Sequence, residues 1–185
     1  ASAAILTTDT RPKRWTKRLA VNAREITLAG TVKGAGMIEP NMATMLSFLL
    51  TDAAVKPDAL QRLLSRAVNR SFNRVSVDGD MSTNDTVLLL ANGAAGNEAL
   101  CEEHPDWPAF RDAVCDTAER LAHMIVADGE GAAKVVTVAV RGADSARDAD
   151  AAARSVARSL LVKTGWSGGR PSWGRVMDAL GYSAA

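Results

Sequence analysis

The sequence predicts an α+β domain made of layered sheets and helices. Short apolar or alternating runs, which are typical of strands, occur in several places. Between them lie longer segments whose apolar side chains recur at three- and four-residue spacing, which is typical of amphipathic helices. The elements follow one another as strand, helix, strand, strand, helix, strand and helix. This order favours an α+β or a layered α/β domain, and we predict the first.

The first half of the chain begins with expected strands and one clear helix. Residues 20–30 alternate loosely and end at a glycine, which predicts one or two short strands. Residues 45–51 are apolar and predict a buried strand, although this length also permits a helix. Residues 57–68 carry the apolar stripe of a helix, and Pro57 suits its first turn.

The middle of the chain mixes alternating runs with the longest helical pattern. Residues 72–77 alternate, and we expect a strand that enters a polar loop. Residues 86–90 predict a more buried strand, and residues 108–128 predict a long helix. Residues 134–141 are apolar on both faces, which predicts a central strand.

The last third of the chain is expected to be helical. Residues 145–161 have one apolar side, and residues 171–180 predict a short final helix with Ser172 as its cap. No repeat and no low-complexity linker interrupts the chain, so we expect one structural unit.

Length and composition bound the function classes. A chain of 185 residues has room for one domain with a real core. Its net charge of +1 argues against a nucleic acid or a membrane surface as the main partner, because such surfaces require concentrated basic charge. Aromatic residues make up only 4%, which argues against a base-stacking platform. We therefore expect neither a nucleic acid nor a membrane as a partner.

The cysteines and the chain start indicate a cytoplasmic protein. Two cysteines, Cys101 and Cys115, do not make a disulfide framework, and we expect reduced thiols. No segment is long and apolar enough for a membrane helix, and residues 1–10 lack the pattern of a signal peptide. The chain starts without methionine, so we interpret it as an internal piece of something longer.

Three polar, glycine-containing segments are candidates for chemistry. They are residues 6–10, 77–86 and 127–131. Hydroxyls and carboxylates beside glycines suit a site where backbone N–H groups approach a ligand, but the same residue types also populate ordinary turns. The alternating acids after Val77 do not form a calcium loop, because its sixth and twelfth positions are Thr83 and Leu89 rather than glycine and glutamate.

Six ordered blocks together resemble the ornithine acetyltransferase (glutamate N-acetyltransferase) family of arginine biosynthesis. The longest block reads KGAGMIEPNMATML, and the resemblance runs from about Ile5 to Gly181. The resemblance implies the layered fold of the ornithine acetyltransferase / DmpA-like type. The blocks are residues 6–13, 33–46, 82–86, 128–134, 161–164 and 171–176.

The resemblance implies a precursor that cuts itself between Ala43 and Thr44. Residues 1–43 would then be the C-terminal part of an α segment, and residues 44–185 the N-terminal part of a β segment, truncated at both ends. The threonine hydroxyl attacks the preceding carbonyl, and water resolves the resulting ester. The cut segments of this family stay associated and assemble further.

After cleavage, Thr44 would be both nucleophile and base. Its free α-amine has an unperturbed pKa of about 7.7–8.0, close to neutral pH. By family resemblance, Thr44 takes an acetyl group from N-acetylornithine and passes it to glutamate, with no metal or other cofactor. Acetyl-CoA is an additional donor in some members. The resemblance carries substrate contacts onto Thr7, Lys33, Thr44 and Glu130, with Lys33 for a carboxylate and Glu130 for an ammonium.

Departures from the family pattern predict little activity for this piece alone. The family's oxyanion-hole Thr-Gly pair precedes the first block, and its C-terminal substrate contacts follow the last. Losing one oxyanion donor typically costs ~10²–10³ in rate. Arg170 and Ser172 also stand where the family usually has Asp and Asn.

Two other functions stay open from the sequence. An N-terminal-nucleophile amidohydrolase or aminopeptidase would use the same cleavage and the same threonine. An inactive fragment would keep only the fold. The charged pair Lys33 and Glu130 favours transfer to an amino acid.

Overall fold

The computed structural model describes residues 1–39 and 45–185, which fall into two compact units. The first unit covers residues 1–130 and the second covers residues 131–185. The sequence led us to expect one structural unit. Because the chain divides into two, each unit is described by itself. The proposed Ala43–Thr44 bond lies outside the described residues.

The first unit begins with a β-hairpin. Strands β1 (Lys13–Val21) and β2 (Arg24–Lys33) pair antiparallel along their length. Asn22 and Ala23 join them with φ angles of 46° and 58°, as a two-residue hairpin turn requires. The expectation of one or two short strands at residues 20–30 is confirmed by β2, but these residues also contain the turn, and β1 starts well before residue 20. Lys13 and Lys17 lie on the same, less exposed face as Trp15 and Leu19, so charged residues interrupt the apolar side of the alternation.

Two more strands extend the sheet in the order β1-β2-β3-β4. Strand β3 (Leu46–Thr51) pairs antiparallel with β2, and β4 (Thr86–Ala91) pairs parallel with β3. Both strands were predicted. A parallel pair needs a long crossover, and helix α1 lies within it.

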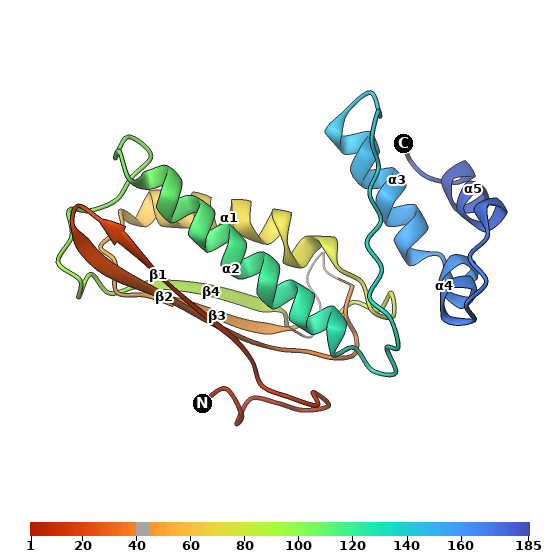
Figure 1. Cartoon of the computed structure of the whole chain (residues 1–185), viewed down its shortest axis with the longest axis horizontal. Coiled ribbons are helices and arrows are strands. Elements are labelled where there is room, and N and C mark those ends of the chain that lie inside the picture. The colour runs from red at the N-terminus through yellow and green to blue at the C-terminus, as the bar shows by residue number, and fades with distance from the viewer. Residues whose placement is uncertain (40–44) are drawn as a thin grey trace. The chain divides into compact units, whose positions relative to one another are not determined.

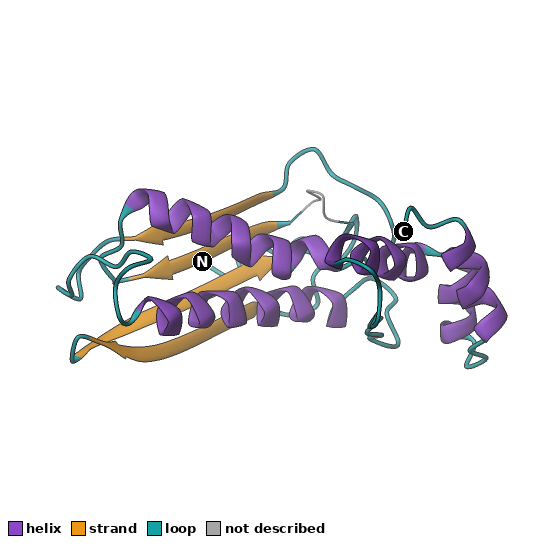
Figure 2. Cartoon of the chain, turned by 90° about the horizontal axis from the view of Figure 1, so that it is seen from above, coloured by secondary structure: helices purple, strands orange, loops and turns teal. Residues whose placement is uncertain are grey.

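Helices α1 (Pro57–Arg70) and α2 (Trp107–Ala127) lie side by side on one face of the sheet (Figures 1 and 2). Both helices were predicted, and Pro57 opens α1 as expected. At Gly30 the helix layer comes very close, because an added Cβ would lie 2.6 Å from Leu121 Cδ1. The side chains that fill the space between the layers are fully buried: Ile26, Leu28, Val32, Leu49, Phe110 and Leu121. The α+β prediction is thus confirmed.

The strand predicted at residues 72–77 is wrong. Residues Phe72–Arg74 form a short 3₁₀ helix, η1, and the following residues are irregular. Phe72 is fully buried, and its carbonyl accepts a hydrogen bond from the Val75 N–H. The chain therefore turns locally here, and the alternation reflects one buried anchor rather than a sheet.

The second unit consists of three helices after an irregular segment. They are α3 (Ala146–Arg158), α4 (Leu160–Ser167) and α5 (Trp173–Gly181). Ser145 caps α3 by accepting a hydrogen bond from the Asp148 N–H at 3.1 Å. Ser172 stands at the N-cap of α5, but its side chain makes no capping bond. The helix predicted at residues 145–161 is confirmed by α3, and the final predicted helix is confirmed by α5. Most of α4 lies beyond the predicted residues.

The central strand predicted at residues 134–141 is also wrong. These residues are irregular, and most of them are exposed. No strand of the described chain pairs with them, and a strand needs a neighbour for its N–H and C=O groups. Val138 instead packs against a small helical core that includes Val156 and Ala179. Apolar alternation alone could not reveal the missing partner.

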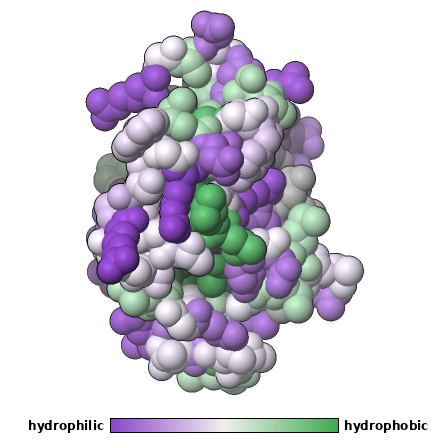
Figure 3. Space-filling view, turned by 90° about the vertical axis from the view of Figure 1, so that its right-hand side faces the viewer, coloured by the Kyte–Doolittle hydropathy of each residue, from purple (hydrophilic) through white to green (hydrophobic). Residues whose placement is uncertain are grey.

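Large apolar side chains remain at the surface of the described residues. On the face shown in Figure 3, hydrophobic side chains reach the surface between hydrophilic ones. In the second unit, Leu160, Trp173 and Tyr182 are exposed, and on the open face of the sheet Leu50 and Leu90 are exposed. None of the described helices is long and apolar enough to cross a membrane.

Candidate active site

Three strand ends meet at one edge of the sheet. Lys33 at the end of β2 is paired with Leu46 at the start of β3, and Leu46 is paired with Thr86 at the start of β4. Lys33 was predicted to contact the substrate. The strand register places it near the residues that follow Thr44 and near the polar loop before Thr86. Thr44 and Ala43 themselves lie outside the described residues.

Asp85 holds the first described residue after Thr44. Its Oδ1 accepts a hydrogen bond from the backbone N–H of Met45, and the Thr86 N–H donates to the Met45 carbonyl at 3.0 Å. Among the residues that the structure describes, Asp85 Oδ2 is buried and has no hydrogen-bond partner. Burial raises the pKa of Asp85 to about 6, while the Met45 N–H and the charge of Lys33 act in the opposite direction.

Asp78 holds the chain on the other side of the undescribed residues. Its two carboxylate oxygens accept hydrogen bonds from the N–H groups of Met37, at 2.6 Å, and Ile38, at 3.0 Å. The Ile38 carbonyl in turn accepts from the Val77 N–H at 2.7 Å. Two carboxylates of one polar loop therefore anchor described residues before and after residues 40–44.

Glu130 lies against the glycine-rich segment that follows Lys33. Its N–H donates to the Ala35 carbonyl at 2.8 Å. A Cβ added at Gly36 would lie 2.7 Å from Glu130 Oε1, so only glycine leaves the carboxylate its present place. Glu130 therefore contacts the residues that precede the proposed cleavage site, although the two segments are far apart in sequence.

A buried charge network, which the sequence analysis missed, links the predicted binding segments. The ammonium of Lys13 forms ion pairs with Asp9 and, at 2.5 Å, with Asp128. These side chains are 1%, 0% and 3% exposed, respectively. Asp9 also accepts hydrogen bonds from the N–H groups of Gly34, at 2.7 Å, and Thr7, at 3.3 Å.

The network ties three chain segments to one cation. Asp128 accepts from both the N–H and the hydroxyl of Thr10. Burial raises the pKa of Asp9 and of Asp128, but Lys13 and the hydrogen-bond donors outweigh burial, so both pKa values lie below the usual range. Through Asp9, Lys13 is linked to Thr7 and to Gly34, which follows Lys33. Its second partner, Asp128, lies two residues before Glu130.

The predicted binding residues differ in exposure. Thr7 and Glu130 are exposed and Lys33 is half-buried. Within the described part of the chain, neither Lys33 nor Glu130 forms an ion pair within 4.0 Å.

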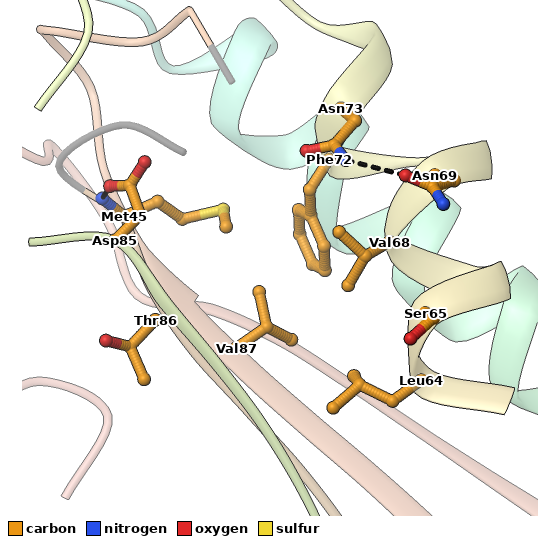
Figure 4. A pocket seen from close by; sticks show the side chains of 10 residues that line it. All are labelled: Met45, Leu64, Ser65, Val68, Asn69, Phe72, Asn73, Asp85, Thr86 and Val87. Carbon is orange, nitrogen blue, oxygen red and sulfur yellow. Dashed lines mark hydrogen bonds between the residues drawn. The ribbon is translucent and has the colours of Figure 1, made fainter. Parts of the chain in front are cut away.

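A cavity of about 250 Å³ lies beside the strand ends (Figure 4). Val68 and Phe72 reach into it from the helix side, and Val87 reaches into it from β4. Met45 and Asp85 lie at its strand-end side, so the Asp85 contact borders an apolar space. In the residues that the structure describes, no group of three or more His, Cys, Asp or Glu side chains could hold a metal ion.

Comparisons with known proteins agree on one family. The model of the ArgJ family matches residues 1–185. The "Arginine biosynthesis bifunctional protein ArgJ, mitochondrial" of Schizosaccharomyces pombe is 49% identical over 185 residues, covering 100% of this chain and 42% of the relative. The ArgJ of Bacillus subtilis is 50% identical over 182 residues, covering 98% of this chain and 45% of the relative. The chain therefore spans less than half the length of these curated relatives.

A solved structure shares the fold. The crystal structure of the arginine biosynthesis bifunctional protein of Bacillus halodurans matches with a TM-score of 0.74 at 47% identity. The match covers 77% of this chain and 67% of that chain. The layered fold expected from the sequence is confirmed by this likeness.

Proposed function

The chain belongs to the ArgJ family, and from this premise we propose that it carries the nucleophile of an acetyltransferase of arginine biosynthesis. The complete protein moves an acetyl group from N-acetylornithine to glutamate after self-cleavage between Ala43 and Thr44. One observation supports this most directly: Asp78 and Asp85 anchor the described residues on both sides of the proposed cleavage site, at the strand edge where Lys33 lies.

The cleavage needs only groups of the chain and water. The Thr44 hydroxyl attacks the Ala43 carbonyl carbon, and the Thr44 nitrogen leaves as an amine, which forms an ester. Water then hydrolyses the ester, releases the Ala43 carboxylate and restores the hydroxyl. Anchors on either side favour this attack because they reduce the motion that separates the reacting groups.

Acetyl transfer then proceeds through an acetyl-threonine ester. The α-amine of Thr44 removes the proton from its own hydroxyl, whose oxygen attacks the acetyl carbonyl. Ornithine leaves with that proton on its nitrogen. The α-amine of glutamate attacks the ester, forms N-acetylglutamate and returns the proton to Thr44.

Charged side chains near the strand edge select amino acids as substrates. Lys33 pairs with a substrate carboxylate, Glu130 pairs with an ammonium of ornithine, and the Thr7 hydroxyl donates to a carboxylate. The absence of ion pairs to Lys33 and Glu130 within the described chain supports these roles. The curated relatives are called bifunctional, so acetyl-CoA is the donor to test beside N-acetylornithine.

The mass of the full-length protein tests the cleavage. We expect a break between Ala43 and Thr44 in the wild type and in Thr44→Ser, and an uncut chain in Thr44→Ala, which lacks the hydroxyl. Thr16→Ala is a matched control, because Thr16 is exposed on β1, and it should cleave as the wild type does. An uncut wild-type protein would count against the proposal and favour an inactive fold.

Incubation with N-acetylornithine, with and without glutamate, tests the reaction. A transferase makes N-acetylglutamate only when glutamate is present. Acetate released at the same rate in both mixtures would instead identify a hydrolase. We further propose a cytoplasmic location for this protein; the S. pombe relative is named mitochondrial.

A further inference from the structure

Asp85 carries a feature that a structural turn residue does not need. Its Oδ1 is used by the Met45 N–H, but Oδ2 is buried and has no partner among the described residues. Within the described residues, Asp85 therefore spends one carboxylate oxygen on the Met45 amide and keeps the other buried beside the same strand ends.

Met45 is covalently joined to Thr44, and its amide nitrogen is bonded to the Thr44 carbonyl carbon. A carboxylate that holds this amide fixes the backbone immediately after the nucleophile. The second bond at this point, from the Thr86 N–H to the Met45 carbonyl, fixes the other side of the same residue. Met45 is itself buried, at 3% exposure, so its backbone has little freedom to move.

Resting on the proposed function, we infer that Asp85 is a positioning residue for acyl transfer at Thr44, acting through the backbone amide of Met45. It touches neither the reacting atoms nor the substrate in this role. Removing it should therefore lower kcat and the rate of self-cleavage while leaving KM nearly unchanged. A charge-assisted hydrogen bond is the strong kind, and its loss corresponds to about a ten- to hundredfold decrease in rate.

Graded substitutions in the full-length protein test this role. Asp85→Leu removes the acceptor, and we expect kcat per cleaved enzyme to fall about a hundredfold. Asp85→Asn keeps a neutral acceptor of the same shape, and we expect a fall of about tenfold. Asp80→Asn is the matched control: Asp80 is an exposed acid of the same loop, and this variant should behave as the wild type.

Two further readouts separate positioning from folding. Hydrogen exchange of the Met45 amide should be slow in the wild type and fast in Asp85→Leu. The midpoint of thermal unfolding of Asp85→Asn should not fall, because burial disfavours the charged carboxylate. Wild-type kcat in Asp85→Leu, a rise in KM with unchanged kcat, or a loss of activity that follows loss of folded protein would each overturn the inference.

The same measurements separate this inference from the proposed function. If the wild type makes N-acetylglutamate and Asp85→Leu makes it equally fast, only the inference fails. If the wild type shows a protected Met45 amide but neither cleaves nor transfers acetyl groups, the proposed function fails, and a positioning role fails with it.

Discussion

Replacing Lys13 with methionine tests how the buried charge network supports the first unit. Methionine has a similar length but no charge, so Asp9 and Asp128 would face each other without their shared cation. Their side chains are 0% and 3% exposed, so water screens them little. Removing one partner of a buried ion pair typically costs about 3–5 kcal/mol, which is a large fraction of the stability of a domain.

The assay is urea unfolding of the chain followed by far-ultraviolet circular dichroism. We expect Lys13→Met to lower the free energy of unfolding by about 3–5 kcal/mol at neutral pH. Lys17→Met is the matched control in the same strand. The ammonium of Lys17 lies 3.3 Å from Asp116, but both side chains are more than a third exposed. Such a surface pair contributes at most about 1 kcal/mol.

The pH dependence of the difference checks the physical cause. The pKa values of Asp9 and Asp128 lie below the usual range, so their stabilising effect is present above the unfolded pKa of 3.8 and is lost as the pH falls through the lowered values. The gap between wild type and Lys13→Met should therefore narrow below pH 4. A loss no larger than that of Lys17→Met, or a gap independent of pH, would refute the reasoning.

Three other substitutions probe close contacts and titration. Gly30→Ala should lower the free energy of unfolding by about 1–3 kcal/mol, because its Cβ would meet Leu121 at 2.6 Å; an unchanged urea midpoint would contradict the close packing. Gly36→Ala should leave the fold intact but displace Glu130 and lower kcat/KM for N-acetylornithine about tenfold; unchanged kinetics would argue against Glu130 as a contact. Burial raises the pKa of Asp85 to about 6, so the wild type should lose stability relative to Asp85→Asn as the pH rises from about 4 to 6, and a constant difference would show that the carboxyl titrates normally.

The sequence pattern predicted correctly those elements whose apolar spacing is visible within a few residues. Helix α1 and strand β3 follow from apolar spacing over a few residues. Residues 72–77 and 134–141 alternate as strands do, yet neither has a partner strand in the described chain. Alternation indicates which side chains are buried. A strand also needs a neighbouring strand to pair with its N–H and C=O groups, and a single sequence does not identify that strand.

The candidate site shows the same limit. The polar loop before β4 was identified as a candidate, and the resemblance identified Lys33 and Glu130. The roles of Asp85 and Lys13 could not be predicted, because each depends on a residue that only the fold brings near. For Asp85 this is the register of the parallel pair β3 and β4, and for Lys13 it is the meeting of β1 with the end of α2.

If the proposed cleavage depends on Asp85, the parallel pairing of β3 with β4 links cleavage to the order of folding. The hairpin of β1 and β2 closes across a two-residue turn, whereas β4 reaches β3 only after the crossover that contains α1 has formed. Long crossovers close slowly because their chain entropy is lost before the contacts form. By this argument we expect the contact between Asp85 and the Met45 amide to form late, together with the pairing of β3 and β4. A chain that depends on this contact for cleavage would stay uncut until its sheet is complete. A cleaved chain would then be one that had already folded.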